Sequence, residues 1–183
     1  TMPLFAYAAT GIFPLKGHDM ATNNASKQTF GLLVGNRGFF PDVLAKEGHT
    51  VLTALLKKLG YGVVVLSPND TKFGAVETWE DAKKCADLFA KKREQIDGVI
   101  VTLPNFGDER GVADTLKMAA LNVPVLVHAW CDDAAKMTIK HRRDSFCGKM
   151  SACNGLTQYK IPFSLTAWHT MDPHTEEFAE EIH

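Results

Sequence analysis

The chain has 183 residues, of which 45% are hydrophobic and 22% are charged, and its formal net charge is -1. This length and composition are typical of a soluble globular protein with one domain, or with one domain and an appendage. The balanced charge disfavours a nucleic-acid partner. Every apolar run is too short to span a membrane.

Residues 1–28 are interpreted as an N-terminal arm. They are mildly apolar, are interrupted by Gly11, Pro14 and Lys16, and lack the basic leader and cleavage pattern of a signal peptide. The arm is expected either to remain a free tail or to pack on the domain or on a neighbouring subunit.

Strand-like runs alternate with helix-like segments from residue 30 onward. Residues 99–101 form an unbroken β-branched run, which is typical of a strand buried on both faces of a parallel sheet. The alternation predicts an α/β fold, a flavodoxin-like (Rossmann-like) three-layer sandwich with helices on both faces of an open parallel sheet. The other expected strands span residues 30–35, 62–66, 123–128 and 162–167.

Helices are expected between these strands. Asp42 is a candidate N-cap for the first helix, and Thr78 and Asp81 have the spacing of a capping box for the second. The third should run from about residue 108 to residue 122.

The fourth helix is expected to begin with Ser145 as its N-cap. Its apolar stripe would be Phe146, Met150 and Cys153, at positions i, i+4 and i+7. The basic segment before it, residues 136–143, is either a loop or a short helix.

The four cysteines show no C-x-x-C pair and no spacing typical of zinc sites or secreted disulfide frameworks. Cys85 is expected on the buried side of its helix, and Cys131, beside Trp130, is a candidate pocket thiol. Free thiols suit a reducing compartment, so we expect a cytoplasmic location.

The folded domain is expected to span residues 29–168, with residues 169–183 as the start of a linker to later domains. This last segment contains the only plausible group of metal ligands in the sequence, but their spacing matches no known site, so we interpret it as a polar linker. The residues concerned are His169, Asp172, His174, Glu176 and Glu177.

Five candidate binding residues follow three strands. Arg37 comes after the first strand, Asn105 and Phe106 after the third, and His128 and Trp130 end the fourth. Ligands of open α/β sheets bind at the carboxyl ends of the strands, and this mixture of aromatic, amide and guanidinium groups suits a sugar.

Each of these assignments has a plain alternative. Arg37 fits a surface turn as well as a ligand contact, and a hydrogen-bonded structural role fits His128 somewhat better than binding. Nucleotide binding is disfavoured, because residues 35–38 lack both the dinucleotide fingerprint and a Walker loop.

Residues 30–167 resemble the N-terminal part of the L-fucose isomerase and L-arabinose isomerase superfamily. The resemblance depends on the order and spacing of several motifs rather than on any one of them. These are residues 36–41 (NRGFFP), 103–109 (LPNFGDE), 128–130 (HAW), 144–150 (DSFCGKM) and 161–163 (IPF).

The resemblance implies an aldose–ketose isomerase that moves a proton between two sugar carbons with carboxylates and a divalent metal, usually manganese. In the family, the metal ligands lie in later domains, and nothing in this sequence matches them. The chain is therefore expected to supply no catalytic residue, to hold no metal and to be inactive alone.

The family also implies that this domain contacts the monosaccharide substrate across a subunit boundary of a homo-oligomer. Arg37 would carry that contact, with Asn105, Phe106, His128 and Trp130 as weaker candidates. The alternative is a free-standing α/β module that binds a sugar or another small ligand without catalysis. The length favours this module, whereas the abrupt ending at residues 180–183 argues against it.

Overall fold

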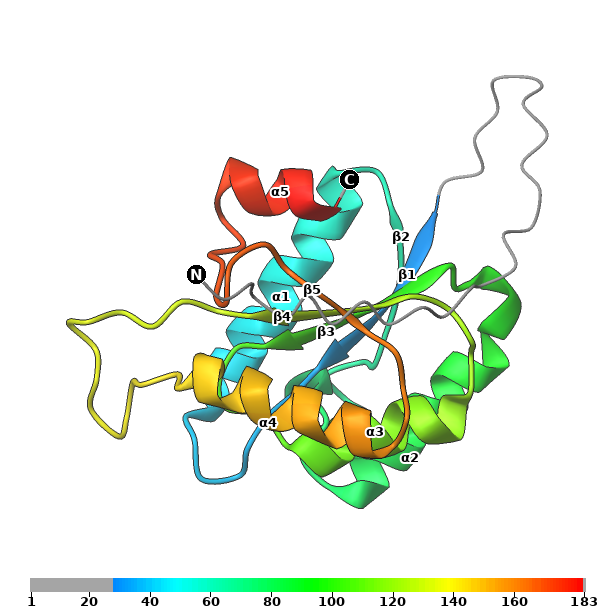
Figure 1. Ribbon diagram of the computed structural model, residues 1–183, viewed down its shortest axis with the longest axis horizontal. Helices are drawn as coiled ribbons and strands as arrows, with labels where there is room; N and C mark the ends of the chain where they lie inside the picture. Colours follow the sequence, from blue (N-terminus) through cyan, green and yellow to red (C-terminus); the bar gives the residue numbers. More distant parts are fainter. Residues whose placement is uncertain (1–27, 183) are drawn as a thin grey trace, which may run out of the picture.

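The structure is a computed structural model and describes residues 28–182 (Figure 1). The predicted arm, residues 1–28, therefore lies almost entirely outside the described residues. The described chain forms a five-stranded, all-parallel sheet in the order β2-β1-β3-β4-β5, which confirms the predicted fold. The strands are β1 (Thr29–Val34), β2 (Gly62–Val65), β3 (Gly98–Leu103), β4 (Val125–Ala129) and β5 (Ser164–Leu165).

Helices cover both faces of this sheet, as Figure 1 shows. Helices α1 (Asp42–Lys58) and α5 (Glu176–Ile182) lie on one face, and three helices lie on the other. These three are α2 (Trp79–Lys91), α3 (Glu109–Ala119) and α4 (Ser145–Gln158); the short 3₁₀ helices are η1 (Lys72–Gly74) and η2 (Arg93–Gln95).

Strand β3 occupies the centre of the sheet and is buried along its whole length, as the β-branched run predicts. Alternate residues face opposite layers: Val99 and Val101 pack towards α2, α3 and α4, whereas Ile100 packs towards α1 and α5. The period of two in side-chain direction thus gives each layer its own core.

The predicted helix starts are partly confirmed. Thr78 and Asp81 form the expected capping box, and Cys85 is buried on the inner side of α2. Asp42 is the first residue of α1 rather than its N-cap, a position taken by Pro41 without a side-chain hydrogen bond. The Asp42 carboxylate instead pairs with Lys72 at 2.6 Å.

Helix α4 differs from the prediction in its cap and in its buried side. Asp144, with a φ of 55°, occupies the N-cap position, and Ser145 is buried. Phe146 and Met150, expected to be buried, are 39% and 53% exposed. The helix packs through Gly148, where a Cβ atom would lie only 1.9 Å from the carbonyl oxygen of Phe106. Such close contact with backbone requires small residues and turns the large ones outward.

The C-terminal part of the described chain is built into the domain. The expected strand 162–167 is reduced to β5, and residues 136–143 form a loop. Residues 169–182, expected to begin a linker, instead pack on the sheet, with Phe178 fully buried and Met171 and Ile182 in the same core. No helix among residues 28–182 combines the length and apolar character needed to cross a membrane.

Candidate functional site

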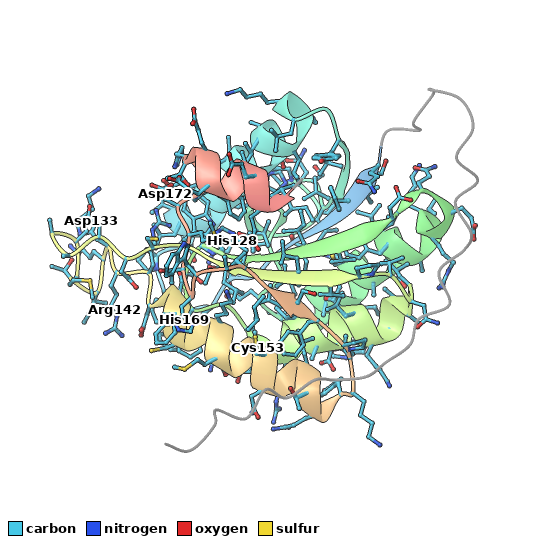
Figure 2. All side chains as sticks on the ribbon, turned by 45° about the horizontal axis from the view of Figure 1, so that its top comes forward. His128, Asp133, Arg142, Cys153, His169 and Asp172 are labelled. Atoms are coloured by element: carbon cyan, nitrogen blue, oxygen red, sulfur yellow. The ribbon has the colours of Figure 1, made fainter. Side chains whose placement is uncertain are left out.

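Three loops meet at the carboxyl edge of the sheet. The Arg37 guanidinium carbon lies 5.3 Å from the centre of the Phe106 ring, and this ring stacks on Phe40 at 5.7 Å. Arg142 lies 5.3 Å over the other ring, that of Phe40. Figure 2 shows Arg142 on the long loop that follows β4. Loops after β1, β3 and β4 therefore supply one cluster of alternating guanidinium and aromatic groups, which we call the edge cluster: Arg37, Phe40, Phe106 and Arg142.

Arg37 is held in the edge cluster by a carboxylate as well as by aromatic rings. Its guanidinium pairs with Glu109 in the first turn of α3 and lies 5.8 Å from the Phe39 ring. The side chains of Arg37 and Glu109 are 29% and 30% exposed. Arg37 is thus oriented by the protein and still reaches solvent, which is what a ligand contact requires.

A buried chain of hydrogen-bonded side-chain amides supports the loops beneath Arg37. Asn105 donates from Nδ2 to Oδ1 of Asn36 at 2.7 Å, and Asn36 donates in turn to Glu77 at 2.6 Å. The side-chain oxygen of Asn105 accepts from the Gly107 backbone N–H at 3.1 Å. Because Asn36 and Asn105 are fully buried, their amides brace the loops and present no surface to a ligand in this structure.

His128 and Trp130 belong to a separate hydrogen-bond chain. His128 Nε2 lies 2.9 Å from the Met171 carbonyl oxygen, which can only accept, so this nitrogen carries the proton. Nδ1 then accepts from the Thr102 hydroxyl at 3.0 Å, and that hydroxyl accepts from the Trp130 indole N–H at 3.0 Å. His128 is fully buried against the Phe178 ring, and Trp130 is nearly so.

The environment of His128 favours the neutral imidazole. Burial lowers its pKa from 6.5 to about 4; the positive charge of Lys149 acts in the same direction, while the hydrogen bond to Met171 and the charge of Asp172 oppose it. A buried imidazole with both nitrogens engaged holds β4 against the segment around Met171, so its observed role is structural.

A pocket of about 650 Å³ lies beside Trp130. Arg143 forms part of its wall, and its guanidinium carbon lies 4.7 Å from the centre of the Trp130 ring. Its Nη1 donates to the Pro104 carbonyl oxygen at 2.9 Å, and its Nη2 donates to the Glu47 carboxylate at 2.6 Å. Polar and apolar side chains line this pocket together. The polar residues include the predicted pocket thiol, Cys131, together with Asp132, Asp133, Lys136, Lys140, His141, Asp172 and His174.

Comparison with known proteins decides the family. Residues 31–183 match the family described as fucose/sulfoquinovose isomerase, N-terminal domain. The chain belongs to this family. The match confirms the resemblance seen in the sequence, and the family's description names isomerases. No curated protein and no solved structure matched the chain.

The described part of this isomerase N-terminal domain offers no metal centre. Asp172 and His174, from the group of possible ligands noted in the sequence, contact each other at 2.7 Å. Within residues 28–182, no three His, Cys, Asp or Glu side chains lie together in an arrangement that could hold a metal ion. The residues present therefore do not fit the manganese that the resemblance implies.

The structure brings together only some of the residues that the sequence suggested. Arg37 and Phe106 are in contact, Asn105 lies beneath them, and His128 and Trp130 form their own network.

Sequence reasoning missed Glu109 and Arg142. Glu109 stood within the motif at residues 103–109, but an acidic residue in a first helical turn has an ordinary structural explanation. Arg142 lies in the basic segment 136–143, and the sequence pattern of this segment did not predict where it lies relative to the sheet.

Proposed function

We propose that this chain is the substrate-contacting and oligomer-forming N-terminal domain of a cytoplasmic aldose–ketose sugar isomerase, and that it is inactive alone. Membership of the isomerase family supports the proposal. The observation that carries it is Arg37, which is oriented by Glu109 and Phe106 yet partly exposed at the carboxyl edge.

The edge cluster has the chemistry that a sugar requires. One side of the Arg37 guanidinium is taken by Glu109, which leaves other N–H groups for sugar hydroxyls. The rings of Phe39 and Phe106 provide apolar surface for the C–H face of a monosaccharide. In this proposal the domain binds and orients the sugar, and the carboxylates that move the proton lie elsewhere in the enzyme.

A contact across a subunit boundary is supported by the distribution of exposed apolar residues. Ile139 is 76% exposed, Phe39 and Trp168 are each 71% exposed, and all three belong to segments that follow strand ends. Large exposed apolar groups gathered on one side of a protein are typical of an interface. The exposed apolar residues in segments that follow strands are Phe39, Val43, Trp79, Met137, Ile139, Phe146, Met150 and Trp168. Met118, near the C-terminal end of α3, and Leu165, in β5, are exposed as well but do not belong to this set.

The metal in this proposal is held outside the described domain. Because the described residues do not fit a metal ion, we derive no catalytic step through one. The proposal for the whole enzyme remains a divalent ion, manganese by resemblance, bound by ligands that residues 28–182 do not contain.

A second candidate function is a free-standing module that binds a sugar or another small ligand without catalysis. The pocket of about 650 Å³ beside Trp130 favours it, since the volume is suitable for a small ligand and polar groups line it. Binding of a monosaccharide by the 183-residue chain alone would favour this candidate.

The test of the main proposal is Arg37→Ala in the complete isomerase. A lost charged hydrogen bond costs about 1.5–3 kcal/mol, so kcat/KM should fall about ten- to a hundredfold. Arg110→Ala is the matched control, because Arg110 is an exposed arginine on α3 next to Glu109. The melting temperature should barely change in either variant. A wild-type kcat/KM for Arg37→Ala would mean that Arg37 is only a surface turn residue.

A further inference from the structure

An apolar pocket of about 260 Å³ lies at the opposite edge of the sheet from the edge cluster. Its most buried wall residues are Val99 of β3, Leu116 of α3 and Val125 of β4, which belong to the core beneath α2, α3 and α4. Val99 and Val125 lie at the amino ends of their strands, so we call this cavity the amino-edge pocket. The rest of its apolar lining consists of Leu121, Val123, Ile161 and Pro162.

The turns that follow α3 and α4 give the amino-edge pocket a fixed outline. Ala120, Asn122 and Lys160 line it with φ values of 46°, 59° and 57°, in the left-handed region that residues with a Cβ atom seldom occupy. Arg93 donates to the carbonyl oxygens of Ala119 at 2.9 Å and Ala120 at 2.7 Å, which holds the end of α3 in place. The pocket is therefore preformed, as binding sites usually are.

The chain enters the domain at this same edge. Thr29 is the first residue of β1, and its carbonyl oxygen accepts from the Asp97 backbone N–H at 2.9 Å. Strand β1 pairs with β3, and β3 pairs with β4. Neighbouring strands lie about 4.8 Å apart, so the amino-edge pocket lies about 10 Å across the sheet from the start of β1.

Residues 1–27, which precede the described residues, carry an apolar group that can reach this pocket. Ile12, Phe13 and Leu15 lie close together in the sequence, and residues 16–28 between them and β1 are mostly polar. Thirteen residues span up to about 40 Å when extended, which is several times the distance needed. A tether of this length gives an effective concentration of the order of millimolar, so a modest intrinsic affinity is sufficient.

We infer that Phe13 occupies the amino-edge pocket of its own chain, with Ile12 and Leu15 on the rim. A cavity of about 150 Å³ accepts a benzene ring, so a pocket of about 260 Å³ has room for the phenyl group. Removal of the phenyl surface from water favours this docking. The arm then leaves the carboxyl edge of the sheet uncovered, and the inference does not rest on the proposed function.

A second apolar groove, of about 450 Å³, lies between α1 and α5 and is the competing site for Phe13. Its apolar wall includes Val51, Leu55 and Leu59, which are only half-buried. Pro173 is the buried residue of this groove, and the others that line it are exposed or half-buried. The amino-edge pocket has three core residues in its wall and therefore buries an aromatic ring more completely.

Methyl and aromatic NMR of the 183-residue chain tests the inference. In the wild type, the Phe13 ring protons should show nuclear Overhauser effects to the methyl groups of Leu116, Val125 and Ile161. The ring should also shift these methyl signals, and the shift should be lost in Phe13→Ala. Phe5→Ala removes an aromatic ring from the same arm and is the matched control, so it should leave the three signals at their wild-type positions.

Three results would overturn the inference. The first is an absence of Overhauser effects from Phe13 to these methyl groups, together with unchanged methyl shifts in Phe13→Ala. The second is Overhauser effects from Phe13 to Val51 and Leu55, which would place the arm in the groove between α1 and α5. The third is contacts seen only between differently labelled chains in a mixture, which would place Phe13 in the pocket of a second copy.

The wild-type Overhauser effects decide the question even if Phe13→Ala does not fold. They are also independent of the proposed function, which is tested by the kcat/KM of Arg37→Ala at the other edge of the sheet.

Discussion

At the residue scale, His128 and Arg37 both lie near the end of a strand, but their environments in the structure differ. His128 uses both ring nitrogens inside the protein, towards Thr102 and Met171. Arg37 uses part of its guanidinium towards Glu109 and reaches solvent with the rest. Only Arg37 of the two has donor groups available to a ligand in this structure.

The neutral, buried His128 predicts an acid-sensitive domain. The pKa of about 4 in the folded state lies below the ordinary value of 6.5, so between these two pH values the unfolded chain binds a proton that the folded chain does not. Stability contributed by this group is therefore lost as the pH falls, by about 1.4 kcal/mol per pH unit within that window. Urea unfolding of the chain at several pH values between 4.5 and 7 measures the slope.

His128→Gln is the control for this pH dependence. The variant is expected to be less stable at pH 7, because the hydrogen bonds to Thr102 and Met171 are disturbed, but its stability should depend on pH less steeply. The charged groups that act on His128, Lys149 and Asp172, stay in place. Identical slopes in the two proteins would contradict the depressed pKa.

At the element scale, helix α4 is organised by close backbone contact. Gly148 faces the backbone of Phe106, in the loop that presents Phe106 to the edge cluster. Next to it, Lys149 is buried, and its ammonium donates to Thr166 at 2.8 Å and to the His169 carbonyl at 3.1 Å. Burial lowers the pKa of Lys149. The helix thereby connects the Phe106 loop with the segment after β5.

Gly148→Ala should separate α4 from the Phe106 loop. A Cβ atom 1.9 Å from a backbone oxygen cannot be accommodated by side-chain movement, so we expect destabilisation by about 3 kcal/mol. Gly155→Ala, on the same helix, is the matched control, because its nearest contact is 3.3 Å from a Cβ atom. Alanine's better helix propensity should keep that variant within about 1 kcal/mol of the wild type. Urea unfolding measures the loss of stability in each variant. Equal losses would contradict the close packing of α4.

At the scale of the whole molecule, the C-terminal segment completes the core on the α1 face. Phe178 of α5 is fully buried and contacts the His128 ring at a centroid distance of 4.2 Å. The Met171 backbone N–H donates to the Ala129 carbonyl at 2.9 Å, which joins this segment to the end of β4. The family match to residue 183 agrees with a domain that includes this segment.

Phe178→Ala should therefore destabilise the whole domain by about 3–5 kcal/mol, the usual cost of removing a buried phenylalanine side chain. Glu180→Ala alters an exposed position of the same helix and should change stability by less than about 0.5 kcal/mol. Thermal unfolding monitored by circular dichroism compares the two. If Phe178→Ala melted like the wild type, residues 169–182 would be a linker after all.

Sequence periodicity and local motifs by themselves determined the architecture. The β-branched run at residues 99–101 predicted the central buried strand, and the alternation of strands and helices predicted the parallel sheet. The capping box of Thr78 and Asp81 was predictable because its two residues lie within one helical turn. The motifs at residues 36–41 and 103–109 indicated the family in the same way, through order along the chain.

Only the tertiary structure decided how the candidate residues are used. Arg37 and Glu109 are 72 positions apart in the chain, and Arg143 and Glu47 are 96 positions apart, so no local pattern predicts either pair. Burial of Asn105 and exposure of Phe146 likewise depend on which backbone segments meet. Periodicity reports the direction of a side chain relative to its own helix or strand, whereas contacts between loops depend on how the complete sheet and its helices pack.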